Sequence, residues 1–77
     1  MHQFTIHFCS FEDVQHFVDM ATQFSFPIIV GNDSYHVNGT SFMGMFSLDY
    51  SRPLQVRLTC SDEDAARFRE AAKSYLT

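Results

Sequence analysis

The stretch Asn38-Gly39-Thr40-Ser41-Phe42-Met43-Gly44-Met45-Phe46-Ser47-Leu48 joins a turn signal, a hydroxyl pair and a run of large apolar side chains. The Asn-Gly pair predicts the end of a strand, because Gly39 can adopt backbone angles that other residues avoid. Thr40 or Ser41 can then cap a helix by accepting a hydrogen bond from a free backbone N–H. We therefore expect a strand, a tight turn and a short helix in this order.

The short helix carries more large apolar side chains than one or two turns can bury. Phe42, Met43, Met45 and Phe46 fall within five positions of one another, so we expect some of them at the surface as a contact patch. Flexible Met and Phe side chains suit adaptable interfaces. We predict that Phe42, Met43 and Phe46 dock partner proteins. The alternative is that they cover the edge of the sheet as part of the core.

Length and charge bound the class of protein. A chain of 77 residues predicts one domain, residues 1–77, and its formal net charge is −4. Lys and Arg are absent before Arg52, so no concentrated basic face exists and nucleic-acid binding is not expected. No apolar run is long enough to cross a bilayer, and no signal peptide is recognised. With only two cysteines, the pattern favours a cytoplasmic protein without disulfides.

The remaining chain alternates between strand and helix patterns. Strands are predicted at Gln3 to Phe8, Phe26 to Val30, Tyr35 to Asn38, and Leu54 to Thr59. Ser10 and Ser61 each precede acidic residues and begin a long helix. The first of these helices has apolar residues at helical spacing, which predicts a buried stripe of Phe11, Val14, Phe17, Val18 and Ala21. The stripe predicted for the second comprises Ala65, Phe68, Ala72, Tyr75 and Leu76.

Four strands in so short a chain predict an α+β fold with the two long helices on one face of an antiparallel sheet. Cys9 follows the first strand and Cys60 the last. Antiparallel pairing of these strands, each about 17–20 Å long, would put the two thiols at opposite ends of the sheet. Both should be free. His2, His7, His16 and His36 lack metal-ligand spacing, so we expect no metal and no cofactor.

The pattern closely resembles HPr, the phosphocarrier of the bacterial sugar phosphotransferase system. That family typically has a Lys-Ser-Ile-Met-Gly-Val-Met-Ser-Leu run, and the identical positions here are Ser41, Met43, Gly44, Ser47 and Leu48. The resemblance implies an open-faced β-sandwich of order βαββαβα with sheet order 1-4-2-3. It places Ser41 on a regulatory serine, with an ordinary helix cap as the equal alternative. It places Phe42, Met43 and Phe46 on an apolar docking surface.

The departure from the family lies at the start of the first long helix. There the family has a phosphoacceptor histidine followed by Thr or Ala, then Arg-Pro. Alignment through Phe17-Val18 puts Ser10 at the histidine position, Glu12 at the arginine and Asp13 at the proline. Ser10 lacks a nucleophilic ring nitrogen, and a carboxylate at position 12 would repel a phosphoryl dianion. A helix cap is the simpler interpretation of Ser10, and His16 lies too far inside the helix to replace the acceptor.

These observations predict a regulatory or adaptor protein of sugar uptake and carbon control, not an enzyme. Its partners would be proteins of the phosphotransferase or carbon-control system, with Ser41 as the gate. The alternative is an accessory phosphocarrier that uses an unusual acceptor residue. A third hypothesis is a conserved fold whose partners have changed. Oligomeric state stays open, with a weak homodimer through Phe42 and Phe46 as one option.

Overall fold

The structure is a computed structural model that describes residues 2–32 and 34–76. Its elements follow the order βαββαβα. They are β1 (His2–Ile6), α1 (Phe11–Ala21), β2 (Ile28–Gly31), β3 (His36–Asn38), α2 (Phe42–Phe46), β4 (Leu54–Leu58) and α3 (Asp62–Ala71). The type and order of every predicted element are therefore confirmed, while the strands begin or end one to two residues from the predicted limits.

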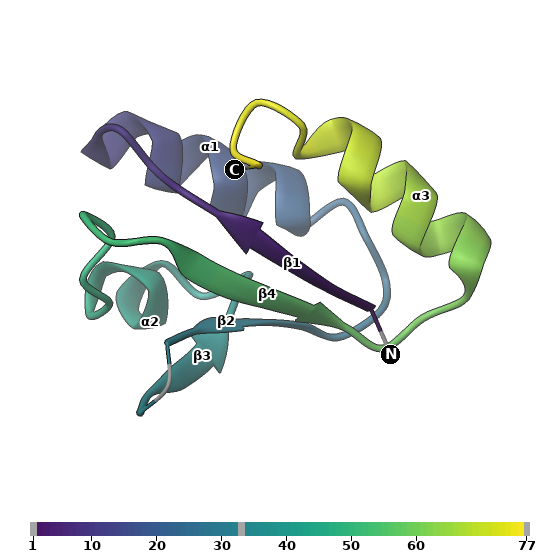
Figure 1. The fold of residues 1–77 in the computed structure, drawn as a ribbon, viewed down its shortest axis with the longest axis horizontal. Helices are drawn as coiled ribbons and strands as arrows, with labels where there is room; N and C mark the ends of the chain where they lie inside the picture. Colours follow the sequence, from purple (N-terminus) through teal and green to yellow (C-terminus); the bar gives the residue numbers. More distant parts are fainter. Residues whose placement is uncertain (1, 33, 77) are drawn as a thin grey trace.

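The four strands form one antiparallel sheet in the order β1-β4-β2-β3 (Figure 1). Val56 of β4 is the centre of a row across the sheet, because it pairs with Phe4 on one side and Val30 on the other. Val30 in turn pairs with Val37 of the edge strand β3. One apolar residue from each of the four strands thus lies in a continuous row across the sheet. This topology confirms the predicted fold class.

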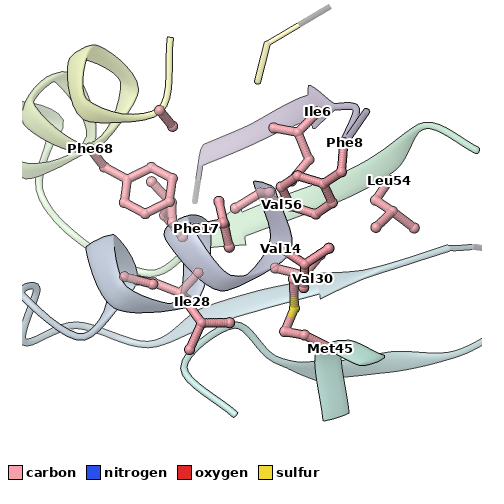
Figure 2. Packing of buried hydrophobic residues seen from close by; sticks show 14 of the residues in the cluster. Ile6, Phe8, Val14, Phe17, Ile28, Val30, Met45, Leu54, Val56 and Phe68 are labelled. Atoms are coloured by element: carbon pink, nitrogen blue, oxygen red, sulfur yellow. The ribbon is translucent and has the colours of Figure 1, made fainter. Parts of the chain in front are cut away.

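All three helices lie on the same face of the sheet. Alternation along β4 turns Leu54, Val56 and Leu58 into the core and leaves Gln55 and Arg57 exposed on the open face. Figure 2 shows side chains from the sheet, α1 and α3 meeting in this core, together with Met45 of α2. Gly44 allows this approach, since a Cβ there would lie 3.1 Å from the Cβ of Val37.

Three fully buried phenylalanines link the layers of the core. Phe17 of α1 meets Phe8 edge to face at a centroid distance of 5.4 Å and Phe68 of α3 at 6.1 Å. Contacts of this kind stabilise a fold by about 0.5–1.5 kcal/mol each beyond the burial of their area. The start of α1, which follows Phe8 directly, is therefore held on a well-packed base.

Three predictions about single residues are wrong. Phe11 is not part of the buried stripe of α1, because 48% of its surface is exposed. Tyr75 and Leu76 lie beyond the end of α3, where they are half-buried and Leu76 bridges to Ile6 of β1. Gly39 is not needed for unusual backbone angles, since no described glycine has a positive φ. It is needed for space, because a Cβ there would lie 2.8 Å from Cγ2 of Ile28.

The two cysteines are free and lie at opposite ends of the sheet, as predicted. Cys9 follows the end of β1 that pairs with Leu54, and Cys60 follows the end of β4 that pairs with His2. Cys9 is exposed, whereas Cys60 is half-buried. Burial raises the pKa of the Cys60 thiol, and the nearby carboxylates of Asp64 and Asp62 add to this rise.

Candidate functional site

Ser10 caps α1. Its Oγ accepts a hydrogen bond from the backbone N–H of Asp13 at 3.4 Å. The Asp13 carboxylate accepts a hydrogen bond from the backbone N–H of Cys9 at 3.0 Å. Both side chains therefore satisfy backbone donors at the start of the helix, which is the pattern of a capping box shifted by one residue. The position that the family resemblance assigns to the phosphoacceptor is thus occupied by a structural hydroxyl.

Ser41, and not Thr40, caps α2. The Ser41 Oγ accepts a hydrogen bond from Gly44 N–H at 3.2 Å, and the Ser41 carbonyl accepts one from Met45 N–H at 2.9 Å. Thr40 instead donates its N–H and its hydroxyl to the side-chain oxygen of Asn38, which closes the turn after β3. Ser41 is half-buried, so its hydroxyl lies at the border between the core and the surface.

The apolar residues of α2 divide between the core and the surface. Met45 is 1% exposed and packs in the core, whereas Met43, two residues earlier, is 83% exposed. Phe42 is 38% exposed, and Phe46 is half-buried against the core cluster. A helix of five residues can present only one face to the sheet, so its other apolar side chains face solvent.

A ring from α1 extends this surface. The Phe11 ring stacks on the Phe46 ring at a centroid distance of 4.7 Å, and Phe46 also contacts Phe42 at 5.6 Å. We call the surface formed by Phe11, Phe42, Met43 and Phe46 the apolar patch. Figure 1 shows why these distant residues meet, since α1 begins at the end of the sheet where α2 lies. Helical periodicity predicted that Phe11 lies in the core. Its position directly after Ser10, which the resemblance aligns with the phosphoacceptor histidine, is the sequence signal that could have placed Phe11 at a functional surface.

Tyr35 contacts the residue that ends α2 and was also missed as a candidate site residue. Its ring is about half exposed, and its hydroxyl accepts a 3.4 Å hydrogen bond from the Ser47 Oγ at the end of α2. In residues 2–32 and 34–76, the exposed large hydrophobic side chains are Phe11, Phe42 and Met43 of the patch, together with Tyr35, which contacts Ser47 at the end of α2. Such a concentration of exposed apolar groups is typical of an interaction surface.

The two helices that form the patch carry only negative charges among their Asp, Glu, Lys and Arg residues. Helix α1 has Glu12 and Asp13 in its first turn and no basic residue in its last, and α2 carries no charged residue. Arg52, in the loop after α2, lies 3.7 Å from the Asp49 carboxylate. Hydrogen bonds from the Ser51 side chain and backbone hold the pKa of Asp49 below its usual range, and Arg52 adds to this lowering.

Between residues 2 and 76, leaving out residue 33, no three His, Cys, Asp or Glu side chains are grouped so that they could hold a metal ion. None of the described helices is long and apolar enough to cross a membrane.

Comparison with known proteins identifies the family. Residues 13–77 match the family model described as "PTS HPr component phosphorylation site". The chain belongs to the HPr family. A crystal structure of an HPr from Thermoanaerobacter tengcongensis is 28% identical, covers 96% of this chain and 93% of its own, and superposes with a TM-score of 0.76. A search of curated proteins found no match.

A second solved structure supports the fold alone. The phosphocarrier protein HPr from Bacillus anthracis is 23% identical, covers 99% of this chain and 94% of its own, and has a TM-score of 0.75. The residues that match the family model begin at Asp13, so Ser10, Phe11 and Glu12 lie outside them. The family is therefore identified by the scaffold and α2, and not by the start of α1.

Proposed function

We propose that this HPr-family protein is a regulatory or adaptor module of the sugar phosphotransferase system that binds partner proteins through the apolar patch. The exposure of Met43 and of the Phe11 and Phe42 rings is the observation that carries this proposal. An 83% exposed methionine adds nothing to the core, and a partner that buries it would gain apolar area. Catalysis is not part of the proposal.

The start of α1 supports docking over phosphoryl transfer. Transfer through a histidine needs a ring nitrogen at the helix start and donors that stabilise a dianion. Ser10 offers a hydroxyl that already caps the helix, and the next exposed polar group is the Glu12 carboxylate. A carboxylate at that place opposes the approach of a phosphoryl group.

Incubation with enzyme I and labelled phosphoenolpyruvate tests this part of the proposal. We expect no acid-labile label on the wild-type protein under conditions that label an HPr with its histidine. The paired variant Ser10→His/Glu12→Arg, which restores the acceptor and the positive charge, serves as the gain-of-function control. Acid-labile label on a wild-type histidine such as His7 or His16 would instead establish the accessory phosphocarrier.

Ser41 is the proposed gate of the patch. A phosphate on its Oγ would add roughly two negative charges next to Phe42 and Met43. A partner that buries this surface would then have to remove water from these charges, which costs free energy. Labelling by the family's serine kinase, with Ser41→Ala as the control, tests the gate. If the kinase labels a relative but leaves the wild-type protein unlabelled, Ser41 is only a helix cap.

Binding is tested by titrating isotopically labelled protein with enzyme I and with that kinase. Partner docking predicts amide shifts at Phe11, Phe42 and Met43, and Met43→Gln should weaken binding. Gln55→Ala is the control, because Gln55 is exposed on the open face of the sheet, opposite to the face that the helices cover. Shifts confined to the open face would contradict docking through the patch.

A further inference from the structure

The rim of the apolar patch restricts the chemistry of its partner. Glu12 follows Phe11 in the first turn of α1, and its side chain is exposed. The ion pairs found among residues 2–32 and 34–76 are His2–Asp62, Arg52–Asp49, Arg67–Asp64 and Lys73–Glu70, and none of them includes Glu12. This carboxylate is therefore available to a partner.

We infer that the patch binds a protein segment with an apolar face bordered by Lys or Arg, and this inference rests on the proposed docking function. A partner that covers Phe11 also removes water from Glu12, which costs free energy unless a cation replaces the water. The elements that form the patch offer no cation of their own, because α1 and α2 together carry Glu12, Asp13 and Asp19 but no Lys or Arg. A basic rim on the partner is the complementary arrangement.

The same charges disfavour a second copy of this chain as the occupant. A twofold interface would place the same surface of both copies face to face, so two Glu12 carboxylates would border one contact. Like charges at such an interface are unfavourable. Of the basic residues, Arg67, Arg69 and Lys73 belong to α3 or follow it, and Arg57 lies on the open face of β4. Arg52, in the loop after α2, lies 3.7 Å from the Asp49 carboxylate. Helix α3 begins after β4, at the other end of the sheet from α2 (Figure 1).

Two synthetic amphipathic peptides of about 18 residues test the inference. They share one Leu- and Phe-rich face, and the flanking positions are Lys in one peptide and Glu in the other. Titrated into labelled protein at low salt, the Lys-flanked peptide should bind about tenfold more tightly and shift the amides of Phe11, Glu12, Phe42 and Met43. The difference should fall to about twofold in 0.5 M salt, because exposed charges are then screened.

Glu12→Arg should abolish or reverse the preference for the Lys-flanked peptide. Glu63→Arg is the matched control, since Glu63 occupies the same place after the cap of α3 as Glu12 does in α1. Glu63→Arg changes the net charge and the charge in the first helical turn by the same amount as Glu12→Arg does. Because Glu63 lies away from the patch, the preference for the Lys-flanked peptide should remain.

The outcomes separate this inference from the proposed function. If the Glu-flanked peptide binds equally or more tightly and shifts the amides of the patch, the inference of a basic rim on the partner is wrong, whereas the proposed docking through the patch still stands. If neither peptide shifts these amides at millimolar concentration, both proposals fail. Shifts at the patch that depend on protein concentration without peptide would make a second copy the occupant and would overturn the inference.

Discussion

The two methionines that flank Gly44 provide a direct test of how α2 is used. Met43 and Met45 have the same side chain and belong to the same five-residue helix, yet one is 83% exposed and the other 1% exposed. We predict that Met45→Ala strongly destabilises the protein, whereas Met43→Ala leaves its free energy of unfolding almost unchanged. Effects of helix propensity largely cancel, because the same substitution is made twice in one helix.

The size of the difference follows from burial. Replacing Met45 by Ala removes three buried heavy atoms, which corresponds to about 2–3 kcal/mol of transfer free energy, and the cavity left behind raises the loss to about 2–5 kcal/mol. The total stability expected for a chain of this size is about 4–12 kcal/mol, so the loss is a large share of it. A surface substitution such as Met43→Ala usually stays within about 0.5 kcal/mol.

Urea unfolding followed by circular dichroism measures both variants, and the thermal midpoint gives a second readout. For a domain of this size, 1 kcal/mol shifts the midpoint by about 4–8 °C, so Met45→Ala should lower it by at least about 8 °C. The double variant Met43→Ala/Met45→Ala should have the same free energy of unfolding as Met45→Ala alone. If Met43→Ala costs as much as Met45→Ala, the surface of α2 is part of the core and the argument for docking fails.

Three further predictions concern other parts of the molecule. Iodoacetamide at pH 8 should modify Cys9 before Cys60, as read by peptide mass spectrometry, because burial limits access to Cys60 and raises its pKa, so less of it is thiolate; equal rates would contradict this. Ser51→Ala should raise the pKa of Asp49 in an NMR titration, since Ser51 supplies the hydrogen bonds that lower it. Because the folded pKa is below that of unfolded Asp, the stability contributed by Asp49 is present above the unfolded pKa and is lost as the pH falls through the folded one, below about pH 4. Gly39→Ala should destabilise by about 1–3 kcal/mol in denaturant unfolding, because its Cβ would meet Ile28 Cγ2 at 2.8 Å; an unchanged midpoint would show that the turn adjusts freely.

Local patterns were sufficient to predict the type and the order of the elements along the chain, because each element has its own periodicity. The alternation of Leu54, Val56 and Leu58 with Gln55 and Arg57 has a period of two, and this fixed both the strand and the face that it buries. Ser10, Ser41 and Ser61 each cap a helix by accepting a hydrogen bond from the third residue after them. The starts of α1 and α3 were predicted at these caps, and the start of α2 was predicted at either Thr40 or Ser41. The order of the strands was not available from periodicity and came from the resemblance to HPr.

The proposed docking surface is harder to predict from such patterns, and Phe11 shows why. Its spacing from Val14 and Val18 is that of a buried stripe, but a helical stripe is buried only where another layer covers it. Here the first turn of α1 meets the end of the short α2, where the Phe11 ring stacks on Phe46 and stays about half exposed. An exposed ring stacked on a half-buried one is held in place by the fold, which lowers the conformational entropy that a partner must remove on binding. Phe11, which periodicity misplaced, is therefore well prepared to act as an anchor in the proposed docking, and under the same proposal the neighbouring Glu12 carboxylate would favour partners with a basic rim.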